Sequence, residues 1–290
     1  MLALPAIELV RKDAPAAGQA TDRGERKLDQ IRPLKIRTGV VSCAAGSAML
    51  ELGRTKVVCS VYGPHATDGR EYLDKGRVEC TFHFAPFARP GRRTRSAPGG
   101  SDEEKLLRIN LGAALGASVQ VHLLPKSIIA VHALVLQDDG GALPAAISCA
   151  SLALADASIQ LYGLVAASEC GVLPKAEGAA ATDSSGSSST ACECALDIST
   201  AELALSRGSA IVACMPELDH MTLVRHEGLV PFEKLTESMQ LGLSGCSLLH
   251  EQMASALKAK LTSAAELSQG QEPPAESGVG QAAGKRMRHQ

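Results

Sequence analysis

The densest group of chemically capable side chains is a run of arginines in residues 87–100, which read FARPGRRTRSAPGG. Arg89, Arg92, Arg93 and Arg95 place four cations within seven residues. Because proline and glycine favour turns, we expect an exposed basic loop. Such a loop can bind the phosphates of a nucleic acid; alternatively, it is simply solvated or pairs with acids of a neighbouring subunit. No aromatic residue lies between the arginines, so base stacking by them is not expected.

Carboxylates and histidines offer weaker candidate sites. Asp138 and Asp139 precede a Gly-Gly pair, where two carboxylates could hold a metal ion, but acidic turn residues more often accept backbone N–H groups. His83 and His132 fall in different predicted strands without an evident third ligand, so we interpret both as packed or surface residues. We therefore predict no metal site.

The nine cysteines include no pair with the two-residue gap of a zinc knuckle or a redox site. Most lie in apolar runs, as small core residues do, and this usage suits the reducing cytosol or nucleus. Cys192 and Cys194 would share one face of a strand. Because no His or further Cys stands nearby to complete a metal site, we interpret them as structural.

The composition limits the class of protein. The 290 residues allow one large domain; 45% are hydrophobic but only 2% aromatic, so Ala, Leu, Val and Ile must build the core. The formal net charge of −2 does not favour electrostatic attraction of nucleic acid over the whole surface, so any RNA contact must come from a local basic patch. The first ten residues lack the basic leader of a signal peptide, and no apolar run approaches the roughly 20 residues that span a bilayer. We therefore expect a soluble intracellular protein without membrane contact.

Apolar periodicity predicts mixed strands and long helices. An ordered domain is expected over residues 31–262, between an N-terminal tail (1–30) and a disordered C-terminal tail (263–290), with a flexible Ser-rich insertion at 175–191. Strands are predicted over 46–52, 55–62, 78–84, 127–136, 164–172, 192–198, 209–215 and 220–225, and helices from 101, over 144–161 and from 231. Hairpins combined with long helices favour an α+β fold over a doubly wound parallel sheet.

Two helices have distinctive features. Ser101 and Glu104 have the spacing of a capping box. The helix over 144–161 is apolar nearly all round and should be buried between layers. Its one acid, Asp156, then needs partners, so we expect it to bond the backbone or a neighbouring helix.

Three segments, in this order and spacing, resemble the RNase PH family of RNA exosome ring subunits. Residues 46–64, GSAMLELGRTKVVCSVYGP, are similar to the family's opening hairpin, and residues 80–119 to its strand, arginine loop and helix. The segment most specific to the family is residues 135–165, VLQDDGGALPAAISCASLALADASIQLYGLV. In it, a strand ends at a Gly-Gly turn, and an Ala-rich helix that ends in Ala-Asp-Ala follows. The resemblance implies the RNase PH-like fold, a ribosomal protein S5 domain 2-like arrangement of mixed sheets packed with helices.

The resemblance also implies where phosphorolysis of RNA would occur. Active members hold phosphate with a Thr-Arg or Ser-Arg pair after the Gly-Gly turn, at the start of a helix. Here Ala142, Leu143 and Pro144 follow Gly140-Gly141. The hydroxyl of the Thr or Ser and the guanidinium of the Arg are therefore both missing from these positions.

The family's acidic motif is only partly matched. Asp197 and Glu202 correspond to its start. At the positions of the family's two catalytic acids, this chain has Leu203 and Ser209. At the positions of the helix arginines that bind RNA, it has Ala113 and Gly116. The resemblance thus implies loss of each catalytic component.

The family context implies a non-catalytic subunit of the exosome core ring, without catalytic residues, cofactor or metal, that supports 3'-to-5' RNA processing and degradation. Implied partners are other RNase PH-like subunits in a hetero-hexameric ring, RNA-binding cap subunits, associated nucleases and RNA, in nucleus, nucleolus and cytoplasm. The arginines at 89, 92, 93 and 95 would bind RNA. The alternatives are an active phosphorolytic 3'–5' exoribonuclease and a composite site in which Arg92 or Arg93 serves an active neighbour.

Overall fold

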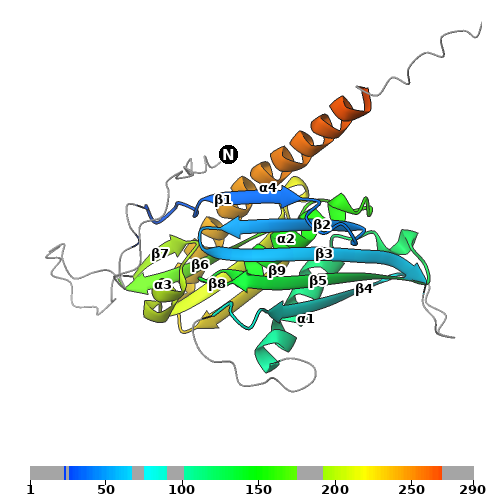
Figure 1. Cartoon of the computed structure of the whole chain (residues 1–290). Helices are drawn as coiled ribbons and strands as arrows, with labels where there is room; N and C mark the ends of the chain where they lie inside the picture. Colours follow the sequence, from blue (N-terminus) through cyan, green and yellow to red (C-terminus); the bar gives the residue numbers. More distant parts are fainter. Residues whose placement is uncertain (1–22, 24–25, 67–74, 90–100, 175–191, 270–290) are drawn as a thin grey trace, which may run out of the picture.

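The computed structural model describes residue 23 and residues 26–66, 75–89, 101–174 and 192–269. The strands form two sheets with helices packed between and behind them (Figure 1). The first sheet has the order β1-β2-β3-β5-β4. Its strands are β1 (Leu34–Thr38), β2 (Gly46–Leu52), β3 (Thr55–Ala66), β4 (Arg77–Phe84) and β5 (Ser127–Gln137). Only the β4–β5 pair is parallel within this sheet.

The second sheet is antiparallel throughout, in the order β7-β6-β8-β9. Its strands are β6 (Ala166–Pro174), β7 (Cys192–Leu196), β8 (Gly208–Met215) and β9 (His220–Gly228). The described α-helices are α1 (Asp102–Gly116), α2 (Ala142–Asp156), α3 (Thr200–Leu205) and α4 (Phe232–Gln269). The predicted α+β class, with mixed sheets and packed helices, is therefore confirmed.

The β2–β3 hairpin follows directly from the sequence. Leu52 faces Thr55 in the register, so the chain reverses at Gly53-Arg54 as expected. Gly53 has a φ of 58°, a left-handed conformation that costs glycine little. Both strands alternate between buried and half-buried residues, because one face of the sheet packs against α2.

Helix α2 lies at the centre of the fold. Every residue from Ala142 to Leu154 is buried, because the helix packs against β2 and β3 of one sheet and β6 of the other. The expectation of a buried Ala-rich helix is confirmed, although the helix ends at Asp156, shortly before Ser158 adopts a left-handed φ of 58°. Asp156 accepts a hydrogen bond from the Ser47 backbone N–H at 3.1 Å and pairs with Lys260 of α4. Both expected kinds of partner are present.

The other helices show what periodicity detects and what it misses. Helix α1 begins with the predicted capping box, in which Ser101 and Glu104 accept each other's backbone N–H groups. Helix α4 packs one face against β6, β7 and β8. Strand β1 and helix α3 were not predicted, because five and six residues are too few to establish a period.

The ends of the ordered body differ from the expected limits. Residues 26–30 were assigned to a tail, yet Gln30 is buried in the body. Helix α4 continues past residue 262 to Gln269. The insertion at 175–191 lies outside the described residues, and the limits of an independently folding unit stay predictions. Among the helices described, none is long and apolar enough to cross a membrane.

Gly46 provides a test of the packing between β2 and α2. A Cβ at Gly46 would lie 2.2 Å from Ala157 N and 2.5 Å from Ala153 O. We expect Gly46→Ala to lower the free energy of unfolding by about 1–3 kcal/mol, because backbone atoms must move apart. At Gly116 of α1 a Cβ would meet nothing within 4 Å, so Gly116→Ala should be neutral or stabilising by up to about 1 kcal/mol. Urea denaturation measures both variants; equal midpoints would contradict this account.

Candidate functional site

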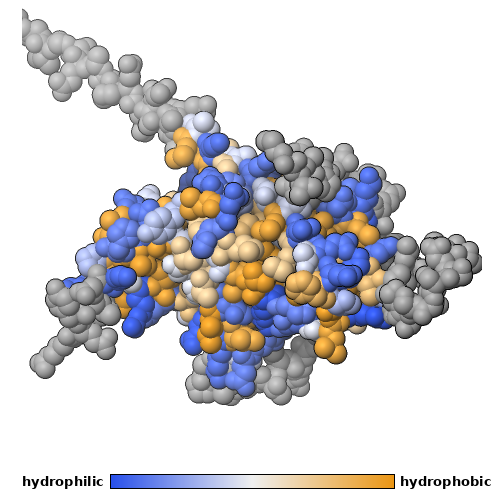
Figure 2. All heavy atoms as spheres, turned by 180° about the vertical axis from the view of Figure 1, so that it is seen from behind, coloured by the Kyte–Doolittle hydropathy of each residue, from blue (hydrophilic) through white to orange (hydrophobic). Residues whose placement is uncertain are grey.

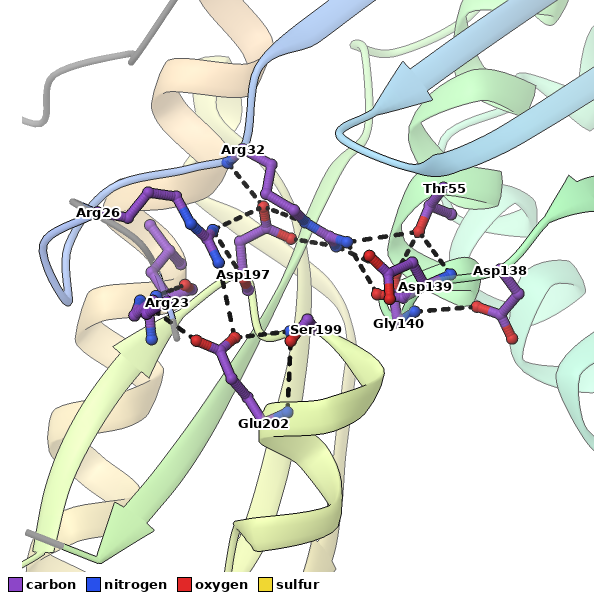
Figure 3. A network of polar contacts seen from close by, with 11 residues as sticks. Arg23, Arg26, Arg32, Thr55, Asp138, Asp139, Gly140, Asp197, Ser199 and Glu202 are labelled. Atoms are coloured by element: carbon purple, nitrogen blue, oxygen red, sulfur yellow. Dashed lines mark hydrogen bonds and ion pairs between the residues drawn. The ribbon is translucent and has the colours of Figure 1, made fainter. Parts of the chain in front are cut away.

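Asp197 and Glu202, the acids expected to match the start of the family's motif, bind arginines of the same chain (Figure 3). Asp197 follows β7 with a left-handed φ of 52° and is buried. Arg32 donates from Nε to Asp197 Oδ2 at 2.9 Å and from Nη2 to Oδ1 at 2.7 Å. The Arg32 backbone N–H donates to Oδ2 at 2.8 Å. The guanidinium and the carboxylate therefore form a two-bond pair of the geometry that Arg and Asp favour.

The rest of the Arg32 guanidinium binds the turn before α2. Nη1 donates to the Asp139 carbonyl at 2.9 Å and Nη2 to the Gly140 carbonyl at 3.0 Å. Thr55 Oγ1 donates to the Gly140 carbonyl at 2.7 Å and accepts the Asp139 N–H at 3.1 Å. Gly140 has a φ of 87°, and a Cβ there would lie 2.7 Å from Ile198 O. Packing against the start of α3 thus requires glycine in this turn.

Two further arginines neutralise Glu202. Arg26 Nη2 lies 3.6 Å from Glu202 Oε2, and Arg26 Nη1 lies 3.8 Å from Asp197 Oδ2. Arg23 Nε lies 3.6 Å from Glu202 Oε1. Glu202 Oε2 also accepts the Ser199 backbone N–H at 2.8 Å, which completes a capping box at α3. Asp197 and Glu202 are therefore both occupied by contacts within the chain.

The ion pair keeps Asp197 ionised. Burial would raise the pKa of Asp197, but the charge and hydrogen bonds of Arg32 outweigh burial and hold that pKa below its usual value. Burial would likewise lower the pKa of Arg32, and Asp197 more than compensates. Because a carboxylate with a lowered pKa holds a proton weakly, Asp197 is poorly suited to general acid or base catalysis near neutral pH.

Glu169 on β6 behaves in the opposite way. Burial, with the neighbouring charge of Asp197, raises the pKa of Glu169 to about 7, although a hydrogen bond with Ser209 and the charge of Arg32 oppose the shift. Glu227 of β9 adds a smaller effect that raises the pKa. A Cβ at Gly141 would lie 3.9 Å from Glu169 Oε2 and 3.8 Å from Asp197 Oδ1. The two carboxyl groups therefore converge on the start of α2.

The positions that the sequence resemblance matched to the family's catalytic residues carry few chemically capable side chains. Ala142 and Leu143 are buried in the first turn of α2, Leu203 is exposed on α3, and Ser209 is buried near the start of β8. The helix positions Ala113 and Gly116 are exposed on α1. None of these side chains supplies a charge for phosphate. Within the described part of the chain, no group of three or more His, Cys, Asp or Glu could hold a metal ion.

Arg89 is the member of the predicted basic loop that the structure describes; Arg92, Arg93 and Arg95 lie outside the described residues. Its two Nη atoms each lie 2.9 Å from a different Glu103 oxygen, and its Nε donates to Asp138 Oδ2 at 2.6 Å. The guanidinium also lies 3.9 Å from the centre of the Phe84 ring. The Arg89 side chain is 43% exposed. Internal contacts thus hold the start of the loop, and RNA binding by the four arginines stays a prediction.

The weaker candidates have local partners. Asp138 Oδ1 accepts the Gly140 N–H at 3.1 Å, as expected for an acidic turn residue. His83 lies 3.6 Å from Glu104, and His132 shares a hydrogen bond with the Thr81 hydroxyl. Cys192 and Cys194 are buried and form no disulfide.

Four charged residues of this site were not predicted from the sequence: Arg23, Arg26, Arg32 and Glu169. The three arginines lie among other basic residues in segment 23–37, so no pattern distinguished them. Glu169 is the one acid in the apolar strand β6. A lone acid in a buried strand is a usable signal, because such a group needs a partner.

Comparison with known proteins identifies one matching family and relatives that are exosome components. The family described as "3' exoribonuclease family, domain 1" (RNase PH) matches residues 30–160. The exosome complex component MTR3 of Homo sapiens is 38% identical over 81% of this chain and 85% of its own length. The RRP41-like exosome component of Arabidopsis thaliana is 34% identical over 80% and 82%. Rrp41 of Pyrococcus furiosus is 30% identical over 89% and 98%.

Two solved structures have the same fold. Rice (Oryza sativa) Rrp46 superposes with a TM-score of 0.67 at 24% identity and covers 81% of this chain and 98% of its own. An Archaeoglobus fulgidus exosome chain, solved with RNA bound to the active site, gives 0.62 at 19% identity and covers 78% and 90%. At these identities the likeness establishes the fold alone.

The buried ion pair predicts a non-additive stability effect. Arg32→Met should lower the free energy of unfolding by about 3–5 kcal/mol, because Asp197 would lose the partner of its buried charge. Adding Asp197→Leu should recover part of that loss. Lys105→Met breaks an exposed pair with Asp102, so it should change stability by less than about 1 kcal/mol. Chemical denaturation of the four proteins is the measurement, and a double variant less stable than Arg32→Met would refute the coupling.

Glu169 predicts a pH-dependent difference. Its folded-state pKa, about 7, lies above the usual 4.5, so its contribution to stability is complete below pH 4.5 and declines as the pH rises through 7. Glu169→Gln removes this decline and should melt at a higher temperature than the wild type at pH 8. Near pH 5 the difference in melting temperature between Glu169→Gln and the wild type should be smaller. Exposed Glu79→Gln controls for loss of a surface charge; an equal shift of Glu169→Gln at both pH values would contradict the prediction.

Proposed function

The chain belongs to the RNase PH family, and from that membership we propose that it is a non-catalytic subunit of an RNA exosome core ring. It supports 3'-to-5' processing and degradation of RNA, including rRNA maturation and mRNA turnover. It does so by completing the ring and by helping to thread RNA toward associated nucleases. Its similarity to exosome components along most of its length supports this role.

One observation supports the absence of catalysis above the others. The two acids that match the family's motif, Asp197 and Glu202, are taken up by ion pairs with arginines from the start of the same chain. Where active members hold phosphate, Ala142 and Leu143 supply neither charge nor hydrogen-bond donors from their side chains. A helix N-terminus alone remains at this place, and phosphorolysis needs both a held phosphate and proton transfer.

Exposed apolar side chains support assembly with other subunits. Leu229 and Phe232, at the β9–α4 connection, are 91% and 80% exposed. Leu205 at the end of α3 is also exposed, and the Leu229 N–H bonds the Arg207 carbonyl at 3.2 Å, which ties these two segments together. On the rear face, hydrophobic residues gather in patches between hydrophilic ones (Figure 2). Patches of this kind are typical of protein interfaces.

The proposed partners are other RNase PH-like subunits in a hetero-hexameric ring, RNA-binding cap subunits, associated nucleases and RNA. The proposed locations are the nucleus, the nucleolus and the cytoplasm. Within the ring, the loop with Arg92, Arg93 and Arg95 would bind RNA phosphates without regard to sequence.

Affinity purification of the chain from its own cells, followed by mass spectrometry, tests the ring assignment. We expect five other RNase PH-like proteins and the cap subunits to accompany it. Recovery of the chain alone or as a homo-oligomer would refute the proposal.

A phosphorolysis assay tests the catalytic part. The purified chain, given a tailed RNA and inorganic phosphate, should release no nucleoside diphosphates, because the phosphate-binding pair is missing. An active RNase PH-family enzyme provides the positive control. Phosphate-dependent release above a no-enzyme blank would instead support the alternative of an active exoribonuclease.

A further inference from the structure

An exposed aromatic side chain stands on a rigid turn just before the basic loop. Phe87 is 74% exposed, while its neighbours Ala85 and Ala88 are buried. The Ala88 N–H bonds the Ala85 carbonyl at 2.9 Å, and the Ala85 N–H bonds the Val135 carbonyl at 2.9 Å. The Asp138 N–H bonds the Ala88 carbonyl at 3.0 Å. The backbone on the two sides of Phe87 is thus bonded to Val135 of β5 and to Asp138 just after it, so the exposed ring stands on a fixed turn.

A hollow of about 510 Å³ opens beside this ring. Its lining residues are Lys56, Phe87, Ala88, Leu136, Gln137 and Asp138. Lys56 and Gln137 face each other across β3 and β5, next to an irregularity of the register between Lys56 and Val57. The hollow is open to solvent, and its volume leaves room for one nucleotide between the ring and the strands.

Lys56 supplies the cation of the hollow. Asp138 Oδ2 accepts a hydrogen bond from Arg89 Nε at 2.6 Å and Asp138 Oδ1 accepts the Gly140 N–H at 3.1 Å, while the Nη atoms of Arg89 bind Glu103. Lys56 has no ion pair with any described residue, although Glu51 lies opposite it in the β2–β3 register. The hollow therefore combines an ammonium group, an amide and an exposed aromatic ring.

We propose that this hollow binds one nucleotide of single-stranded RNA, with its base stacked on Phe87 and its phosphate near Lys56. The Gln137 amide lies where it can bond the edge of the base. Stacking on aromatic rings beside a cation is the common way in which proteins hold single-stranded RNA without strict sequence preference. A purely apolar protein anchor fits less well, because Lys56 and Gln137 would then lose contact with water. The inference rests on the proposed role in an RNA-threading ring.

The test uses the ring reconstituted with its partner subunits and a fluorescein-labelled oligouridylate. Phe87→Ala should weaken RNA binding at least about fivefold, the ratio that corresponds to ~1 kcal/mol for one stacked base. Phe87→Trp should retain binding, because a larger aromatic ring still stacks. Lys56→Gln should weaken binding and reduce its dependence on salt concentration by about one phosphate contact. Tyr162→Ala removes another exposed aromatic residue, far from the hollow in the sequence, and should leave binding unchanged.

Ring assembly is measured on the same samples by size-exclusion chromatography. Weaker RNA binding by Phe87→Ala in an intact ring would support the inference, as would ultraviolet cross-linking of RNA to the peptide that contains Phe87. Unchanged RNA affinity would overturn it. Loss of assembly with Phe87→Ala would also overturn it, because Phe87 would then be a contact between subunits. Failure of the wild-type chain itself to enter the ring would refute the proposed function, so the two failures are distinguishable.

Discussion

The pair formed by Arg32 and Asp197 determines the arrangement around it. Two opposite charges are buried together, and neither is tolerated in the interior without the other. The remaining donors of Arg32 bind the carbonyls of Asp139 and Gly140, so the same side chain positions the turn before α2. The entry to β1, the start of α2 and the exit of β7 therefore meet at one guanidinium.

The small side chains of α2 make this meeting possible. A helix whose residues from Ala142 to Leu154 are all buried lets the two sheets lie close on either side of it. Asp197 and Glu202, which lie near its start, face the chain's own arginines. Asp197, which follows β7, is bonded to Arg32 ahead of β1 and so links the two sheets.

Local patterns predicted much of the fold. The β2–β3 hairpin follows from a turn glycine between alternating strands, and α2 from an unbroken apolar stretch after a Gly-Gly pair. Strand β1 and helix α3 escaped prediction because they are short and acquire their burial from distant segments. The expected tail was similarly misleading near its end, since Gln30 becomes buried only through tertiary contacts.

The candidate site was less predictable than the fold. The uncharged positions at the start of α2 could be read from the sequence, but the partner of Asp197 could not, because Arg32 is one of several basic residues in its segment and lies 165 positions away. The partners of Arg89 could not be predicted either, because Glu103 and Asp138 come from two other parts of the chain. Exposure of Phe87 also depends on the geometry of one turn, which composition does not reveal.

The distance between Arg32 and Asp197 along the chain has a consequence for biosynthesis. The two residues are 165 positions apart, and ribosomes add about 5–20 residues per second. The guanidinium therefore waits for roughly 10–30 s before its carboxylate emerges. During that interval the β2–β3 hairpin can form, but Arg32 lacks the carboxylate that neutralises it in the folded chain. We expect the nascent chain to be a client of ribosome-associated chaperones until β7 has left the exit tunnel.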